Sequence, residues 1–228
     1  CSWSESSRLH RHRRERPLPS PASGMPTDRP IGNQPGEIKP GLRRRIRAER
    51  SALPPAEARA AADVAVHRLW SLPCLARARS LAIYLPAAGE LDCTPVAVEA
   101  WRRGREVFLP VIDGSALRFA PFHLRSELRA NRFGIPETVT PRREWRTARQ
   151  LDVIVAPLVA FDVHGHRLGM GGGFYDRTLA FRARRLWARR PHFIALAFEL
   201  QKIAELPSDA WDVRLDAVVT ESETYRFA

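Results

Sequence analysis

The fold of this chain is indicated most clearly by residues 151–177, which read LDVIVAPLVAFDVHGHRLGMGGGFYDR. The stretch begins with an almost continuously apolar segment, Leu151 to Val155, which is typical of a strand covered on both faces of a sheet. A loop follows in which four of the thirteen glycines of the chain fall within five residues, 169–173. A predicted helix, Asp176 to Arg189, comes next. A strand, a glycine-rich loop and a helix in this order predict an α/β fold that binds its ligand beyond the carboxyl end of the strand.

The chain on either side of this stretch continues the alternation of strands and helices. Apolar residues at helical spacing predict helices, and short apolar or alternating runs predict strands. The predicted helices are Leu42–Ser51, Glu57–Leu72 and Thr94–Arg103, and the further predicted strands are Ser80–Leu85, Glu106–Ile112, Leu117–Phe122, Phe193–Phe198 and Leu215–Val219. This alternation predicts an α/β domain with a largely parallel sheet.

The composition is that of an ordinary globular protein, with 228 residues, of which 44% are hydrophobic and 27% charged. The first 35 residues differ, because they are rich in serine, proline and arginine and carry no apolar periodicity. Such a segment cannot bury enough apolar surface to offset the entropy of ordering. We therefore expect residues 1–35 to be a disordered extension and residues 36–228 to form one domain. One interpretation places the residues before Met25 upstream of the true start.

Two further features bear on where the protein works. The longest apolar run, Val153 to Phe161, has nine residues, whereas a membrane-spanning helix needs about 20, so we expect no membrane-spanning segment. The three cysteines, Cys1, Cys74 and Cys93, stand at unrelated positions and form neither a disulfide framework nor a zinc-binding pattern. This usage favours a reducing, cytoplasmic location.

The net charge is +12, because 37 basic residues stand against 25 acidic ones. A charge of this size can indicate a polyanionic partner. However, only Lys39 and Lys202 are lysines, an arginine skew that is typical of GC-rich coding, and the excess is spread along the chain. A small anionic ligand in a positive cleft explains the charge equally well, and we do not expect nucleic acid as the main partner.

The glycine-rich loop is suited to holding a phosphate. Glycines permit positive φ angles and close approach of the backbone, so that N–H groups can face an anion. Arg167 and Arg177 add positive charge on either side, and Asp176 can cap the following helix or hold a Mg²⁺ carried by phosphates. The loop lacks the Gly-Lys-Ser/Thr of a Walker A motif, and its glycine spacing excludes a dinucleotide fingerprint. A tight turn without a ligand is the alternative.

The loop and its flanks resemble the signature of the 5-formyltetrahydrofolate cyclo-ligase family, also called 5,10-methenyltetrahydrofolate synthetases. The signature combines a strand end, glycines at fixed spacing and a helix start, here Pro157, Ala160-Phe161-Asp162, Gly165, Arg167-Leu168-Gly169, Gly171, Gly173, Tyr175 and Asp176. The resemblance continues over residues 38–221. It includes Lys39 and Arg43, Tyr84-Leu85, Gly89-Glu90-Leu91-Asp92, Gly134-Ile135-Pro136-Glu137 and a C-terminal block that contains Asp212 and Asp216.

This resemblance implies a three-layer α/β/α architecture, the NagB/RpiA/CoA-transferase-like fold of the family. It also implies a ligase that uses ATP and Mg²⁺ to convert 5-formyltetrahydrofolate to 5,10-methenyltetrahydrofolate, with release of ADP and phosphate. In that reaction the formyl oxygen is phosphorylated and N10 then attacks. The implied partners are the reduced folate and ATP, and we expect a cytoplasmic monomer.

The resemblance also assigns roles to residues. The implied catalytic residues are Lys39, Arg43, Glu90 and Tyr175. The implied ATP-binding residues are Lys39, Arg43, Arg167, Leu168, Gly169, Met170, Gly171, Gly172, Gly173, Phe174 and Tyr175. The implied folate-binding residues are Leu85, Glu90, Met170, Gly171, Gly172, Gly173 and Phe174, and the implied metal ligands are Asp176 and Asp212.

Two positions depart from the family pattern. Met170 stands where the family often has tyrosine or a basic residue, and Phe174 replaces the first tyrosine of a pair. Both keep apolar bulk, so we expect altered affinity rather than lost chemistry. Judged by position alone, Glu90, Lys39 and Arg43 could also be solvated surface side chains.

Two other functions are compatible with the sequence. One is a non-catalytic, arginine-rich RNA-binding relative of the same fold, which would show a steep salt dependence. The other is an ATP-dependent ligase that acts on a different formyl or acyl substrate, because substrate choice depends on the shape of the pocket.

Overall fold

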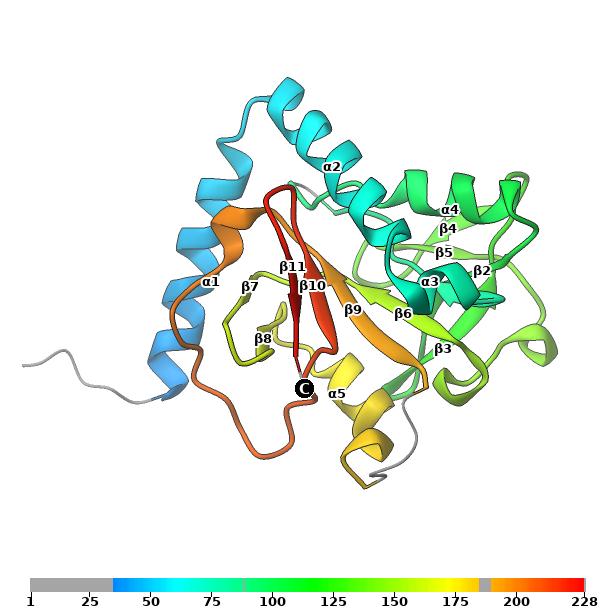
Figure 1. The fold of residues 1–228 in the computed structure, drawn as a ribbon. Coiled ribbons are helices and arrows are strands. Elements are labelled where there is room, and N and C mark those ends of the chain that lie inside the picture. Colours follow the sequence, from blue (N-terminus) through cyan, green and yellow to red (C-terminus); the bar gives the residue numbers. More distant parts are fainter. Residues whose placement is uncertain (1–34, 88, 185–189, 228) are drawn as a thin grey trace, which may run out of the picture. The chain divides into compact units, whose positions relative to one another are not determined.

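The computed structural model describes residues 35–87, 89–184 and 190–227, which belong to one compact unit of the chain, residues 34–228. At its centre is a seven-stranded sheet in the order β11-β10-β9-β6-β1-β2-β3 (Figure 1). The strands are β1 (Ser80–Ala82), β2 (Glu106–Asp113), β3 (Ala116–Pro121), β6 (Val153–Ala156), β9 (His192–Leu196), β10 (Ala217–Val219) and β11 (Thr224–Arg226). The five strands from β10 to β2 are parallel, and β3 and β11 are antiparallel edge strands. The largely parallel sheet is therefore confirmed.

Helices cover both faces of this sheet. The α-helices are α1 (Pro35–Ser51), α2 (Pro55–Trp70), α3 (Pro73–Arg77), α4 (Thr94–Arg102) and α5 (Phe174–Leu179). Short 3-10 helices span Arg142–Glu144, Ala148–Gln150, Ala180–Arg184 and Glu199–Gln201. Helices α2, α3 and α4 pack on one face and α5 on the other, which confirms the three-layer α/β/α architecture (Figure 1).

The alternation of side chains along β6 shows why the sheet needs both layers. Val153 and Val155 point into the apolar core beneath α2 and α4, whereas Ile154 and Ala156 point into the core beneath α5. All four residues are buried. A central parallel strand with apolar residues on both faces is stable only when helices exclude water from both sides.

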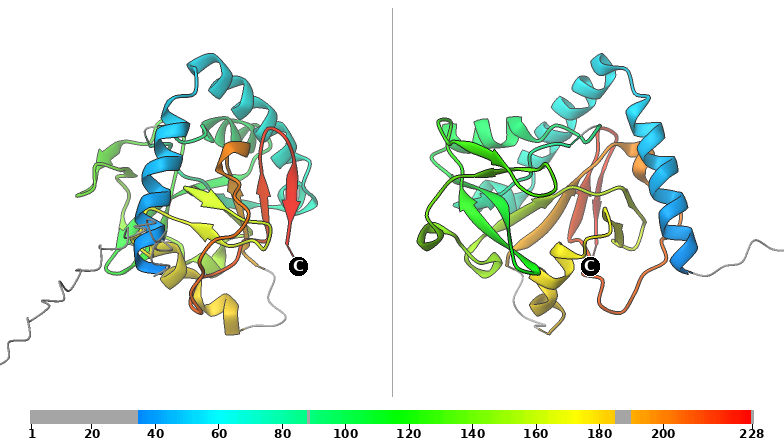
Figure 2. Two further views of the ribbon diagram at one scale, coloured as in Figure 1. Left: turned by 90° about the vertical axis from the view of Figure 1, so that its left-hand side faces the viewer. Right: turned by 180° about the vertical axis from the view of Figure 1, so that it is seen from behind.

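Helix α1 has a different environment from the other helices. Its buried Ile46 packs against Val159, Ala160 and Leu168, which lie in and next to a small hairpin formed by β7 (Ala160–Phe161) and β8 (Arg167–Leu168). Figure 2 shows α1 running beside this hairpin and the 199–201 turn. Helix α1 therefore lies along the segment that leads from β6 into the glycine-rich loop.

Several element boundaries differ from the sequence-based predictions. Helix α1 begins at Pro35 rather than at Leu42 and contains Pro40 as its sixth residue, where proline has no N–H to donate within the helix. The predicted helix from Asp176 is α5 followed by a 3-10 helix up to Arg184, and its residues 185–189 lie outside the described residues. The predicted extension, residues 1–35, also lies outside them, except for Pro35.

Besides short 3-10 helices, one helix and five strands of the described residues were not predicted from the sequence. They are α3, the edge strand β11, the β7–β8 hairpin and a second hairpin of β4 (Leu128–Ala130) and β5 (Pro136–Thr138). All are short, and their strands have two or three residues each, too few for a pattern of period two to be recognised. None of the helices in the described part of the chain has the length and apolar character needed to span a bilayer.

Candidate active site

The candidate site lies where β1 and β6 end. These strands are parallel neighbours in the sheet, with Leu81 opposite Val153 and Ala82 opposite Ile154. Strand β6 leads through the β7–β8 hairpin into Gly169–Gly173, and β1 leads into the segment that carries Leu85 and Glu90. Because both strands point the same way, the two segments leave the same edge of the sheet, where ligands of α/β folds bind.

The conformation of the loop explains two of its glycines. Gly171 has a φ of +103° and Gly173 a φ of +62°, both in the region that residues with a side chain avoid. A Cβ atom at Gly173 would also lie 2.6 Å from Nη1 of Arg177. Arg177 donates from Nη2 to the carbonyl of Gly172 over 2.6 Å and stacks over Phe174, with 5.1 Å between its Cζ and the ring centroid. The loop is therefore tied to the helix that follows it.

Helix α1 contacts this part of the site through Lys39 and Arg43. Arg43 donates from Nε to the carbonyl of Gly169 over 2.8 Å, and a Cβ atom at Gly171 would lie 3.6 Å from its guanidinium. Lys39 pairs through Nζ with Asp209 at 2.7 Å and with Asp212 at 3.7 Å. Residues four apart lie on one helix face, so α1 presents both cations to the same region of the site.

Asp176 and Asp212 come from different segments of the chain. They are linked through Val213, the residue after Asp212, whose backbone N–H donates to Asp176. Asp176, in the first turn of α5, accepts at Oδ1 from Nη2 of Arg167 over 2.8 Å and from the backbone N–H of Val213 over 3.1 Å. Asp212 precedes Val213 and accepts at Oδ2 from the N–H of Asp209. Among the described residues, no group of three or more His, Cys, Asp or Glu side chains is arranged to hold a metal ion.

Glu90 lies on the other side of the site, within a turn. Its carboxylate accepts at Oε2 from the N–H of Ala87 over 3.0 Å, and its own N–H donates to the carbonyl of Ala87 over 2.9 Å. The preceding Leu85 is half-buried against the core beneath α2 and α4. Glu90 is thus held by its turn and is not an unconstrained surface side chain.

Tyr175 connects the two sides of the site. Its ring stacks on Phe193, with 5.8 Å between the ring centroids. Burial raises the pKa of Tyr175 well above its ordinary value, and the nearby negative charge of Glu90 raises it further. Burial raises the pKa of Tyr84 in the same way, and its hydroxyl donates to the carbonyl of Leu91 over 2.8 Å. Both phenols are therefore neutral hydrogen-bonding groups at ordinary pH.

The two residues that depart from the family pattern lie at the rim. Met170 is 56% exposed, and Phe174 makes an edge-to-face contact with Phe133 of the β4–β5 turn, with 6.2 Å between the ring centroids. Arg167 is nearly buried, with a 5% exposed side chain, and donates from Nη1 to the carbonyl of Val213. The structure brings the predicted residues Lys39, Arg43 and 167–176 together, and it places Glu90 within electrostatic reach of Tyr175.

Sequence reasoning missed two residues that shape this site, Asp209 and Arg50, and it named Tyr84 only as part of the family resemblance. Asp209 pairs with Lys39, although the two are 170 residues apart. Buried Tyr84 and buried Arg50 lie within electrostatic reach of Glu90. No local pattern marks Asp209 or Arg50, since one is an acid in an irregular segment and the other is one of five arginines in a basic helix.

Comparisons with known proteins agree with this geometry. The family model described as the 5-formyltetrahydrofolate cyclo-ligase family matches residues 35–221. The chain is 38% identical over 186 residues to the 5-formyltetrahydrofolate cyclo-ligase of Escherichia coli (strain K12), which covers 80% of this chain and 100% of that protein. It is 34% identical over 176 residues to the cyclo-ligase of Haemophilus influenzae, which covers 75% and 90% of the two chains.

A solved structure is similar to the described fold as well. The NMR structure of Aquifex aeolicus 5,10-methenyltetrahydrofolate synthetase superimposes with a TM-score of 0.71 at 33% identity, covering 83% of this chain and 92% of that one. The Mycoplasma pneumoniae synthetase, at 24% identity and a TM-score of 0.63, shows the same fold. On the strength of the family match and these relatives, the chain belongs to the 5-formyltetrahydrofolate cyclo-ligase family of enzymes.

Proposed function

We propose that this enzyme uses ATP and Mg²⁺ to convert 5-formyltetrahydrofolate to 5,10-methenyltetrahydrofolate, with release of ADP and phosphate. The observation that carries the proposal is the contact of Arg43 with Gly169 and Gly171. This contact puts the cations of α1 and the N–H groups of the glycine loop around one region. Cations and backbone N–H groups at one place fit a triphosphate.

The proposed reaction has two steps. The formyl oxygen on N5 attacks the γ-phosphorus of ATP, a P–O bond forms, and ADP leaves. N10 then attacks the formyl carbon, its N–H proton is lost, and the C–O bond breaks as phosphate leaves. An amide oxygen is a weak nucleophile and a poor leaving group, and phosphorylation solves the second difficulty. The protein therefore has to align the two substrates and neutralise charge.

We assign the triphosphate to Lys39, Arg43 and the loop from Arg167 to Tyr175. Lys39 and Arg43 would neutralise phosphate oxygens, and the loop would donate N–H groups to them. Lys39 pairs with the carboxylates of Asp209 and Asp212 and lies one helical turn from Arg43, so its ammonium could exchange these acids for a phosphate. A lysine suits this role because its ammonium is a compact, rotatable donor.

The donor set fits a magnesium ion. Mg²⁺ prefers carboxylate oxygens, keeps several waters and usually binds through one or two carboxylates and substrate phosphates. Asp176 uses Oδ1 for its hydrogen bonds, and its Oδ2 accepts no hydrogen bond from any described residue. Asp176 and Asp212 would hold the ion, which when bound supplies charge neutralisation on the transferring phosphate.

We assign the folate to Leu85, Glu90 and the side of the loop formed by Met170–Phe174. Leu85, Met170 and Phe174 would contact the folate rings, and Glu90 would accept a hydrogen bond from the pterin or from the N10 side. The neutral hydroxyl of Tyr175 would donate a hydrogen bond to the phosphate or to the formyl oxygen. The negative charge of Glu90 raises the pKa of Tyr175, so the two side chains lie near each other, which supports their assignment to one substrate.

The proposal is tested by following the methenyl absorption band with purified protein, 5-formyltetrahydrofolate, ATP and Mg²⁺. A signal that requires both ATP and Mg²⁺ supports the proposal. A folded protein that binds ATP without producing the signal acts on another formyl or acyl substrate. A protein that binds RNA with a steep salt dependence and does not bind ATP is the non-catalytic relative, and the proposal is then wrong.

The expected cellular setting belongs to the same proposal. Cys74 and Cys93 are free thiols, which fits the reducing, cytoplasmic location expected from the sequence. A monomer stays a prediction, and light scattering of the purified protein checks it.

A further inference from the structure

Arg50 is a buried charge that the proposed reaction does not use. It lies in the last turn of α1 and is 4% exposed, whereas Arg44, Arg45 and Arg47 of the same helix are exposed. A buried charge costs several kcal/mol unless it is paired or hydrogen-bonded. A guanidinium at this position therefore has a defined set of neighbours, and those neighbours indicate its role.

The contacts of Arg50 reach two segments of the candidate site. Its Nη1 donates to the carbonyl of Leu158 over 3.3 Å, in the segment that leads from β6 toward the glycine loop. On another side its Nε would lie 3.6 Å from a Cβ atom placed on Gly89. Gly89 has a φ of +72° and directly precedes Glu90. The guanidinium thus packs against the backbone of the turn that presents Glu90.

The electrostatic interactions in this region also connect Arg50 with Glu90. Burial lowers the pKa of Arg50, and the negative charge of Glu90 acts in the opposite direction and stabilises the guanidinium. Tyr84, which is buried beside them, interacts with both Arg50 and Glu90. Among the described residues, the negative charge of Glu90 acts on the buried cation of Arg50 and on the neutral side chains of Tyr84, Cys93 and Tyr175.

We propose that Arg50 is a positioning residue that holds the Gly89–Glu90 turn and orients the Glu90 carboxylate toward the folate. Helix α1 then serves both substrates, with Lys39 and Arg43 directed to the nucleotide and Arg50, through Glu90, to the folate. The inference rests on the proposed function, because it takes Glu90 to be the acid that contacts the folate. It adds a residue that makes no contact with either substrate.

The test compares two substitutions of Arg50 with a matched control. Arg50→Met keeps the length and removes the charge, and because Glu90 is only half-buried, its carboxylate can stay solvated without the cation. Arg50→Lys keeps the charge but replaces the planar, forked guanidinium with a single ammonium group. Arg44→Met removes an arginine from the exposed face of the same helix. For each variant the melting temperature is measured, with the KM for 5-formyltetrahydrofolate and the KM for ATP.

We expect Arg50→Met to raise the KM for 5-formyltetrahydrofolate about tenfold, to leave the KM for ATP within about twofold, and to leave the melting temperature within a few degrees. The KM of Arg50→Lys for 5-formyltetrahydrofolate should lie between those of Arg50→Met and the wild type. Arg44→Met should have the KM values and the melting temperature of the wild type. In a Glu90→Gln background, Arg50→Met should have little further effect, because residues that act through one another are not additive.

Three results would overturn the inference: an unchanged KM for the folate, a parallel rise in both KM values with a lower melting temperature, or additivity with Glu90→Gln. Binding of 5-formyltetrahydrofolate without ATP, measured by equilibrium dialysis, separates this inference from the proposed function. If the wild type binds the folate but does not turn it over, the proposed reaction is wrong, and the effect of Arg50→Met on binding still decides the role of Arg50.

Discussion

At the scale of single residues, the assignment of Asp176 leads to a direct test. Asp176→Asn keeps an oxygen that can accept from the N–H of Val213 but removes the negative charge that would hold Mg²⁺. We expect kcat/KM to fall about a thousandfold, which corresponds to roughly 4 kcal/mol of transition-state stabilisation. Steady-state rates at several Mg²⁺ concentrations, with the melting temperature of each variant, provide the measurement.

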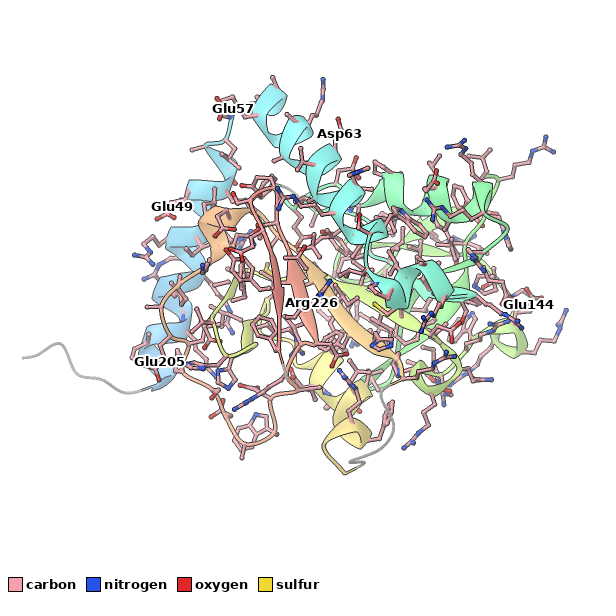
Figure 3. The ribbon with its side chains drawn as sticks, viewed as in Figure 1. Glu49, Glu57, Asp63, Glu144, Glu205 and Arg226 are labelled. Carbon is pink, nitrogen blue, oxygen red and sulfur yellow. The ribbon has the colours of Figure 1, made fainter. Side chains whose placement is uncertain are left out.

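Asp63→Asn is the matched control for this substitution. Asp63 is an exposed aspartate on α2, shown in Figure 3, and its loss should change neither activity nor its magnesium dependence. If Asp176→Asn keeps wild-type turnover at every Mg²⁺ concentration, Asp176 is not a metal ligand.

Tyr175 makes a prediction about pH. Because burial and then the charge of Glu90 raise its pKa, the phenol keeps its proton as the pH rises, and it can act as a donor but not as a base. We expect Tyr175→Phe, which keeps the ring stack on Phe193, to lower kcat/KM about tenfold through the loss of one hydrogen bond. The pH profiles of the two proteins from pH 6 to about 9 should have the same shape. An alkaline decline in the wild type that Tyr175→Phe removes would show that the phenol does titrate there.

At the scale of elements, the glycine loop can be tested by adding single methyl groups. Alanine at Gly171 has to adopt a φ of +103°, which costs about 1–2 kcal/mol in the left-handed region, and its methyl group would meet the guanidinium of Arg43. We expect Gly171→Ala to raise the KM for ATP about tenfold because the loop has to shift. Isothermal titration with ADP measures the same effect without turnover.

Gly169 provides the internal control for this loop. Its φ lies outside the left-handed region, and a Cβ atom there would meet no described atom within 4 Å. Gly169→Ala should therefore bind nucleotide as the wild type does. If both variants lose nucleotide affinity equally, the loop tolerates a side chain at neither position, and Gly171 has no special role.

At the scale of the whole molecule, Asp162 makes stability depend on pH. It is fully buried and accepts hydrogen bonds from the N–H groups of His164, His166 and Leu206 and from Nδ1 of His166. Burial alone would raise its pKa, but these hydrogen bonds outweigh burial and lower the pKa below the ordinary value of 3.8. Its contribution to stability is therefore fully present above pH 3.8 and is lost as the pH falls through the lowered pKa.

Urea unfolding of the wild type and of Asp162→Asn at pH 7 and at about pH 3 checks this prediction. At pH 7 we expect the variant to lose about 2–4 kcal/mol, since an amide replaces a buried carboxylate among several donors. The difference between the two proteins should shrink at the lower pH, where the wild-type carboxylate begins to bind a proton. A difference that stays constant with pH would show that the ionised form of Asp162 is not the stabilising one.

The sequence by itself determined the class of the fold and most of one side of the site. The apolar run of β6 and the glycines at 169–173 are local signals, since burial on both faces and positive φ angles restrict residue types at single positions. They located the strand and the loop, whereas the pairing of Lys39 with Arg43 came from the family signature, because the predicted helix began only at Leu42 and the helix of the structure begins at Pro35. The family signature added the folate side, which no local pattern carried.

The tertiary structure decided which residues meet across long separations. Lys39 pairs with Asp209 across 170 residues, Arg43 contacts Gly169 across 126, and Arg50 contacts Leu158 across 108. Such contacts depend on how helices and strands pack, and packing is a property of the whole chain rather than of a local window. The arginines of α1 cannot be told apart by their sequence. Only the packing of the whole chain determines that Arg50 is the one buried beside Glu90.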